Sequence, residues 1–362
     1  MIRKTHLKLV FILIFLAMLF PTFSSAEENT VFEINGKKVP PGEVMSFKVK
    51  VEVEEDNDCF IPITVINGKH KGKVLALAAG VHGFEYPPIL ALYRLKDQID
   101  PDDLSGTLIL IYIANLPGFQ KRIIYYNPYD WKNLNRVFPG NPKGTQAERI
   151  AYVLIEEIVK KCDCLIDLHC GDGNEALIPY TYWMISDDEE LNKITRQMAL
   201  AFGIKHIIID DSRIKDLKQS KYLGNTALLL SKPAITTESG YLGNIDEEST
   251  VRNVHGILNV MKLFKMIAGE PDMPESAVWI DKYEVVYSEY DGLFYPLTEM
   301  GYYVKKGEPI GYITDYFGEK LKTYTAPFTG ILLYIIYTPP ANAGEPLFEV
   351  GRVTESSESS VK

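Results

Sequence analysis

The chain has 362 residues, a formal net charge of −10 at pH 7, 46% hydrophobic residues and 24% charged residues, which is the composition of an ordinary globular protein. An acidic protein is a poor partner for nucleic acid, because neutralising phosphates requires clustered lysine and arginine. The length allows one large domain or two smaller ones.

The first 26 residues have the pattern of a signal peptide. Lysine and arginine side chains up to Lys8 precede an apolar run over residues 9–20, and Ser24 and Ala26 supply small residues for cleavage. The run is shorter than the roughly 20 apolar residues of a membrane span. We therefore expect cleavage after Ala26, with retention as an anchor as the alternative. The mature protein is then exported, to the periplasm or the extracellular space, with no stable membrane span. The sequence does not indicate an oligomeric state.

The cysteines are Cys59, Cys162, Cys164 and Cys170. Export makes disulfides possible, but four cysteines in a chain of this length do not make a disulfide scaffold. Their spacing also differs from that of a zinc ribbon. We expect buried thiols, and a single disulfide involving Cys59 is the alternative.

The elements predicted in chain order begin with β-strands over residues 31–70 and then alternate between strands and helices. The strands are expected within 74–80, 106–118, 164–173, 205–211 and 233–238. The helices are expected within 87–99, 145–162, 188–203, 222–232 and 247–269. Thr145 and Glu148 form a capping box at the start of the second helix, and Gly203 closes the third. This alternation predicts a layered α/β domain over residues 27–272 with a mostly parallel central sheet.

The composition changes after the segment "GEPDMPES". Residues 278–354 contain short strand-like runs separated by glycine and proline turns, which predicts a small all-β, barrel-like domain. Residues 355–362, "ESSESSVK", predict a disordered tail.

Polar side chains follow three of the predicted strands. These are His82 with Glu85, Asp167 with His169, and Glu238. Open α/β sheets bind ligands at the carboxyl ends of their strands, and catalytic zinc often takes two histidines and one glutamate while leaving a position open. We expect His82, Glu85 and His169 to bind one zinc ion per chain, with Asp167 accepting a hydrogen bond from a ligand imidazole. Glu238 is then the candidate general base.

Each of these residues also has an ordinary structural interpretation. A histidine at a strand end can be purely structural, Glu238 can cap a helix, and Asp167 can accept a local hydrogen bond. Their convergence on one sheet edge favours a site over these separate explanations.

A loop over residues 119–144 supplies further candidates. Arg136 offers a planar fork that suits a carboxylate, and the adjacent Asn135 adds amide hydrogen bonds. Arg122 is a candidate for polarising a substrate carbonyl and stabilising an oxyanion. The alternatives are a loop bonded to itself and a surface arginine.

Four motifs, "GVHGFEY", "NLNRVFPG", "DLHCG" and "TTESGYLG", occur in the order and at the spacing of the succinylglutamate desuccinylase/aspartoacylase family, which belongs to the zinc carboxypeptidase superfamily. The resemblance covers about residues 45–352. It implies a zinc-carboxypeptidase-like fold and zinc bound by His82, Glu85 and His169. It also implies a substrate carboxylate held by Asn135 and Arg136, and a water activated by Glu238.

These expectations describe a secreted zinc-dependent amidohydrolase acting on an N-acyl amino acid or a small peptide. A metallocarboxypeptidase that removes C-terminal residues is one alternative. A non-catalytic binding protein on the same scaffold is another.

Overall fold

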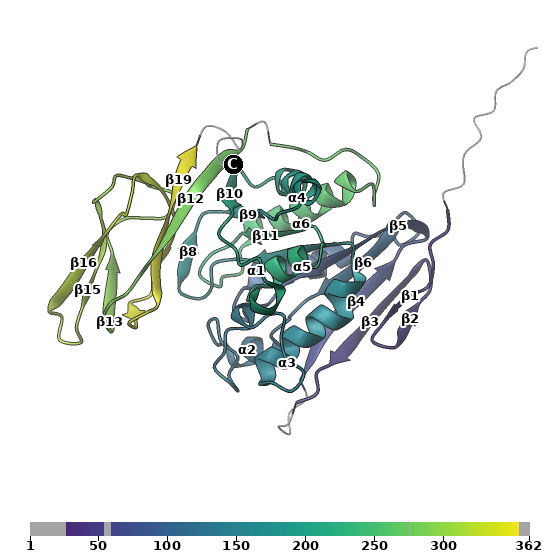
Figure 1. Ribbon diagram of the computed structural model, residues 1–362, viewed down its shortest axis with the longest axis horizontal. Coiled ribbons are helices and arrows are strands. Elements are labelled where there is room, and N and C mark those ends of the chain that lie inside the picture. Colours follow the sequence, from purple (N-terminus) through teal and green to yellow (C-terminus); the bar gives the residue numbers. More distant parts are fainter. Residues whose placement is uncertain (1–26, 54–58, 275, 355–362) are drawn as a thin grey trace, which may run out of the picture.

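The computed structural model describes residues 27–53, 59–274 and 276–354 (Figure 1). The predicted signal peptide and C-terminal tail lie outside these residues. Among the described helices, none combines the length and the apolar character that a membrane span requires.

A 13-stranded sheet runs through the molecule (Figure 1). Its order is β14-β17-β19-β12-β10-β9-β11-β7-β5-β6-β4-β3, with β8 paired to β17. The strands of its central part are β3 (Glu43–Lys50), β4 (Phe60–Asn67), β5 (His70–Ala78), β6 (Ser105–Ile111), β7 (Cys164–His169), β9 (Tyr180–Met184), β10 (His206–Asp210) and β11 (Ala234–Glu238). The remaining strands are β8 (Glu175–Leu177), β12 (Val278–Tyr287), β14 (Tyr303–Val304), β17 (Gly330–Ile336) and β19 (Pro346–Thr354).

The sheet is mixed, which corrects the prediction of a mostly parallel one. Strand β5 is parallel to β6 and β7, β7 to β11, and β10 to β9 and β12. Strand β4 pairs antiparallel with both β3 and β6, and β9 pairs antiparallel with β11. Parallel neighbours need a crossover, usually a helix. The chain between β7 and β9 contains only the short strand β8, so β9 returns in the opposite direction.

Helices cover both faces of the central strands, which confirms the layered α/β prediction. On one face, α1 (Tyr86–Lys96), α4 (Glu189–Phe202) and α6 (Glu247–Leu263) bury apolar side chains against the sheet. On the other, α3 (Gln146–Val153) and α5 (Leu223–Leu229) do the same. Helix α2 (Leu116–Lys121) lies in the loop after β6.

The predicted helix ends are confirmed at two positions. The side chain of Glu148 accepts a hydrogen bond from the backbone nitrogen of Thr145 at 2.8 Å, as in a capping box. Gly203 ends α4 with φ at 86°, in the left-handed region that glycine adopts without strain. The second predicted helix is less regular than expected, because α3 continues as a π-helical turn (Leu154–Ile158) and a 3-10 turn (Val159–Lys161).

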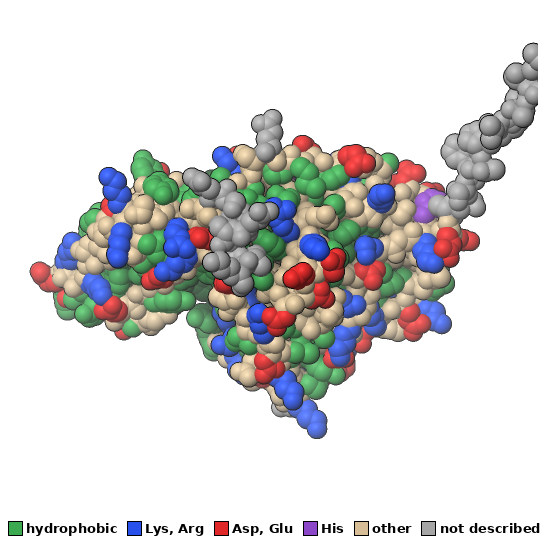
Figure 2. Space-filling view, turned by 45° about the horizontal axis from the view of Figure 1, so that its top comes forward, with side chains coloured by type: hydrophobic (Ala, Val, Ile, Leu, Met, Phe, Trp, Pro, Cys, Tyr) green, Lys and Arg blue, Asp and Glu red, His purple; other side chains and the backbone are tan. Residues whose placement is uncertain are grey.

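The C-terminal strands form two packed sheets. A four-stranded sheet of β16 (Lys320–Thr325), β15 (Pro309–Thr314), β13 (Gly292–Pro296) and β18 (Pro340–Ala341) shares an apolar core with β17 and β19. Strand β12 pairs antiparallel with β19 on one side and parallel with β10 on the other. The C-terminal strands therefore extend the central sheet, at the yellow end of the chain in Figure 1. On the face shown in Figure 2, acidic and basic side chains are interspersed.

All four cysteines are buried, as expected, and Cys162, Cys164 and Cys170 carry free thiols. Burial raises the pKa of Cys162 to about 12, so its thiol stays protonated at neutral pH.

Candidate active site

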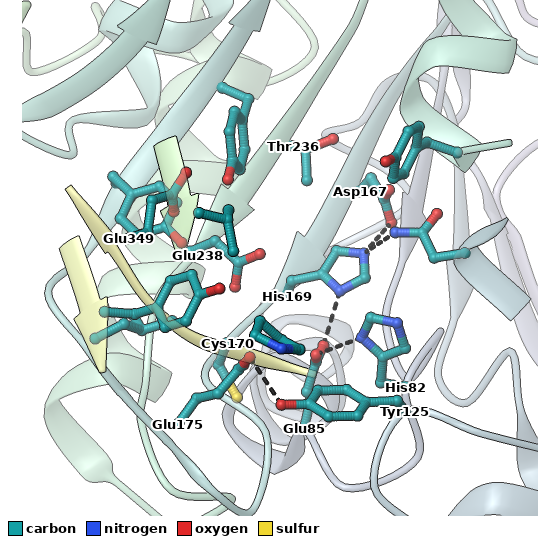
Figure 3. Close-up of a pocket in the computed structure, with 18 of the residues that line it drawn as sticks. His82, Glu85, Tyr125, Asp167, His169, Cys170, Glu175, Thr236, Glu238 and Glu349 are labelled. Carbon is teal, nitrogen blue, oxygen red and sulfur yellow. Dashed lines mark hydrogen bonds and ion pairs between the residues drawn. The ribbon is translucent and has the colours of Figure 1, made fainter. Parts of the chain in front are cut away.

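A cavity of about 380 Å³ lies where the central strands meet the C-terminal ones. Its lining combines the sequence-predicted residues with side chains of the C-terminal strands (Figure 3). The lining includes His82, Glu85, Asn135, Arg136, Asp167, His169 and Glu238 from the prediction, and Tyr283, Val285, Tyr334 and Glu349 from the C-terminal strands. Cavities of this size are typical of small-molecule sites.

The loop that carries His82 and Glu85 needs glycine for close packing. A Cβ atom on Gly83 would lie 2.1 Å from the backbone nitrogen of Phe119, a distance that no side chain tolerates. Glu85 directly precedes α1, whose first turn contains proline, a residue well suited to begin a helix. These constraints hold the two polar side chains at the end of β5.

His82, Glu85 and His169 converge as the sequence predicts. The Nδ1 atom of His82 lies 2.7 Å from Oε1 of Glu85, and Nδ1 of His169 lies 2.9 Å from Oε2 of the same carboxylate (Figure 3). The three side chains offer ligand atoms that all lie within 4.8 Å of one another. Burial raises the pKa of Glu85, but the two histidines outweigh it and lower the pKa to about 2. Two imidazoles and a carboxylate in this arrangement fit a zinc ion.

Asp167 and Asn133 contact the imidazole rings at the nitrogen that faces away from Glu85. Nε2 of His169 lies 3.1 Å from Oδ1 of Asp167, and Nε2 of His82 lies 3.1 Å from Oδ1 of Asn133. Nδ1 of each ring therefore faces Glu85 and Nε2 faces an oxygen acceptor, the arrangement that orients histidine ligands in metalloproteins. Burial lowers the pKa of His169, but Asp167 and Glu85 raise it well above the usual range. Asn133 was not predicted, although it lies within the motif "NLNRVFPG".

Glu238 ends β11 beside His169. The two residues are paired in the register of β7 and β11, so their side chains leave the sheet on the same face. Burial raises the pKa of Glu238 well above its ordinary value, and the positive His169 opposes that rise. A carboxyl group so close to the triad is positioned to exchange protons with a reacting water.

Asn135 and Arg136 also line the cavity. The Oδ1 atom of Asn135 accepts a hydrogen bond from the backbone nitrogen of Leu223 at 3.0 Å, and its Nδ2 lies 3.4 Å from Nε2 of His169. Arg136 stacks over the ring of Tyr222 at 4.7 Å and keeps an exposed side chain. Its guanidinium lies at the rim of the cavity, and its Nη1 donates a hydrogen bond to the backbone oxygen of Asn135 at 2.8 Å.

Arg122 does not line the cavity with them. It is exposed and ends α2 in the left-handed conformation, with φ at 56°. The structure does not place Arg122 among the residues that line the cavity, so its assignment to an oxyanion stays a prediction.

Arg213 is a cavity arginine that the sequence did not reveal. It forms an ion pair with Asp210 and stacks over the rings of Tyr182 and Tyr222, at 5.2 and 4.2 Å. Its loop carries no motif, and its place depends on contacts with distant strands. Glu349 was missed as well, although a glutamate within the apolar run "PLFEVG" is itself a signal.

Comparison with known proteins gives the class of this fold and site. Residues 71–264, more than half of the chain, match the model of the succinylglutamate desuccinylase/aspartoacylase catalytic domain. The chain therefore belongs to the succinylglutamate desuccinylase/aspartoacylase family, as its motifs predicted.

The chain is also similar to individual proteins of known name or structure. The N-α-acetyl-L-2,4-diaminobutyric acid deacetylase of Halomonas elongata is 28% identical over 320 residues, which cover 85% of this chain and 91% of that protein. The product-bound ectoine utilization protein EutE (DoeB) of Ruegeria pomeroyi has the same fold, with a TM-score of 0.77, 24% identity, and coverage of 90% of this chain and 100% of that one. A succinylglutamate desuccinylase/aspartoacylase of Rhodobacter sphaeroides aligns with a TM-score of 0.74, 24% identity, and coverage of 86% and 96%.

Proposed function

We propose that this protein is an exported, zinc-dependent amidohydrolase that removes the acyl group from an N-acyl amino acid. The observation that carries the proposal is the convergence of His82, Glu85 and His169 beside Glu238 in one cavity, in a member of this family. The Halomonas elongata relative, named as a deacetylase of an N-acetyl amino acid, supports the choice of reaction.

The residues present fit a zinc ion. Glu85 faces both imidazoles through Nδ1, and Asp167 and Asn133 face the two Nε2 atoms. Zinc bound by His82, Glu85 and His169 would acidify a water and polarise the acyl carbonyl.

The chain's own residues then account for substrate orientation and proton transfer. Arg136 at the cavity rim binds the carboxylate of the substrate, with Asn135 beside it. Glu238 takes a proton from the attacking water as oxygen adds to the acyl carbon, and it delivers that proton to the nitrogen when the carbon–nitrogen bond breaks. The products are a carboxylic acid and a free amino acid.

The size of the cavity favours a deacylase over a carboxypeptidase. About 380 Å³ suits a single N-acyl amino acid, and Tyr334 and Glu349 of the C-terminal strands wall one side. We expect these side chains to hinder the binding of a longer peptide. Activity on tetrapeptides equal to that on N-acyl amino acids would contradict this choice.

The decisive experiment measures zinc content and the hydrolysis of a panel of N-acyl amino acids and short peptides, for the wild type and Glu238→Gln. We expect about one zinc per chain in both proteins and turnover only in the wild type. Bound zinc with no hydrolysis by the wild type would favour the binding-protein alternative. A protein that cannot be loaded with zinc would remove the basis of the mechanism. Export is tested separately, by the N-terminal sequence of the mature protein, which should begin at Glu27.

A further inference from the structure

Glu349 lies in the middle of an apolar strand and faces the cavity. Its neighbours Phe348 and Val350 pack in the core between the two C-terminal sheets, so Glu349 points to the other face of β19. The residue is only 1% exposed and lines the cavity. In Figure 3 it lies on the opposite side of the view from His82.

The carboxylate of Glu349 is buried without a hydrogen-bond partner in the part of the chain that the structure describes. Neither oxygen finds a hydrogen-bond partner among the residues that the structure describes. Its neighbours are already engaged: Glu175 accepts a hydrogen bond from the hydroxyl of Tyr125 at 2.8 Å, and Arg213 is paired with Asp210. A buried carboxylate without a partner is costly, and such groups are rare in folded proteins. A ligand is therefore the natural source of the missing partner.

The surroundings of Glu349 suit an organic cation. Its partners across the strands are Val285 of β12 and Tyr334 of β17, and both line the cavity. Tyr283, two residues before Val285 on the same face of β12, also lines it, and so does Tyr182 of β9. Aromatic rings around a carboxylate attract ammonium groups through the ring faces as well as the charge.

We propose that Glu349 binds a cationic side chain of the substrate, so that the enzyme selects N-acyl derivatives of diamino acids over those of neutral amino acids. This inference rests on the proposed function, since it assigns the substrate class of the same site. In the bound state the ammonium group donates hydrogen bonds to the carboxylate of Glu349, while the acyl group lies at the His82, Glu85 and His169 triad and the α-carboxylate at Arg136.

Binding of free amino acids tests Glu349 without requiring turnover. The probes are two pairs of amino acids. In each pair the side chain of the first member ends in an ammonium group and that of the second in a methyl group: 2,4-diaminobutyrate with norvaline, and ornithine with norleucine. Calorimetry on the zinc-loaded wild type should show at least about tenfold tighter binding of one diamino acid than of its neutral partner. Glu349→Gln should reduce that ratio at least about tenfold. The matched control is Glu284→Gln, because Glu284 is exposed on β12, pairs with Val350 and should leave the ratio unchanged.

Hydrolysis of the corresponding N-acetyl compounds provides the second measurement. The ratio of kcat/KM between the cationic and neutral member of a pair should fall in Glu349→Gln and not in Glu284→Gln. A ratio that Glu349→Gln leaves intact, a wild type that prefers the neutral member, or the absence of binding by all four amino acids would overturn the inference. Diamino acids bound through Glu349 but with no acetyl compound hydrolysed would overturn the proposed function and leave the cation site standing.

Discussion

The buried carboxyl group of Glu349 leads to a prediction about stability that requires no substrate. Burial raises the pKa of Glu349 from its ordinary value of 4.5 to about 8; Arg213 opposes the rise, and Asp210 and Glu175 add to it. Other groups near this carboxylate are the phenols of Tyr180, Tyr182, Tyr283 and Tyr334. Between about pH 4.5 and pH 8 the folded protein holds a proton on Glu349 that the unfolded chain has lost, so folding stability falls as the pH rises through this window.

The size of the effect follows from the two pKa values. At about pH 6 the ionisation of Glu349 in the unfolded chain already lowers the free energy of unfolding by about 2 kcal/mol, and by about pH 9 the loss reaches about 5 kcal/mol. Glutamine cannot ionise and incurs neither loss. The stability of Glu349→Gln relative to the wild type should therefore increase by roughly 2–3 kcal/mol between about pH 6 and about pH 9.

Chemical denaturation at the two pH values, with the metal content fixed, measures this difference. Groups that titrate in both proteins cancel in the comparison, and Glu284→Gln again provides an exposed control, whose relative stability should not change with pH. An equal effect of Glu349→Gln at both pH values would refute the reasoning. That result would mean that Glu349 has the same pKa in the folded and in the unfolded chain.

Three further predictions concern the catalytic side of the cavity. Glu238→Gln should lower kcat by about 10²–10⁴-fold without changing the zinc content measured by atomic absorption, because it removes only the proton acceptor. Asp167→Asn should weaken zinc affinity about 10–100-fold in a competition titration with a chelator, since it weakens the orientation of His169; unchanged affinity would show that Asp167 does not support the ligand. Arg136→Ala should lower kcat/KM far more than Arg122→Ala, because Arg136 lines the cavity and Arg122 does not. Equal losses would indicate that Arg122 also acts on the substrate.

Much of the catalytic side of the cavity could be predicted from local sequence. His82 and Glu85 are three residues apart after a buried strand, and Asp167 and His169 are two apart on another. The alternation of a strand places the second pair on one face, and Glu238 ends a strand that is paired with theirs. Short-range geometry and the rule that ligands gather at strand ends were sufficient for these residues.

The sequence alone determined the family motifs, the α/β layering and the predicted triad, because periodic patterns reveal the elements and polar side chains mark the strand ends where ligands bind. Tertiary structure decided which way β9 runs, that β12 joins the central sheet, and that Arg213 lies in the cavity while Arg122 does not. It also placed Glu349 opposite Val285 and Tyr334, 64 and 15 residues away along the chain. The alternation of a strand predicts that its two faces differ, but it does not predict which elements cover each face. The partners of a side chain are therefore fixed only when distant strands pair.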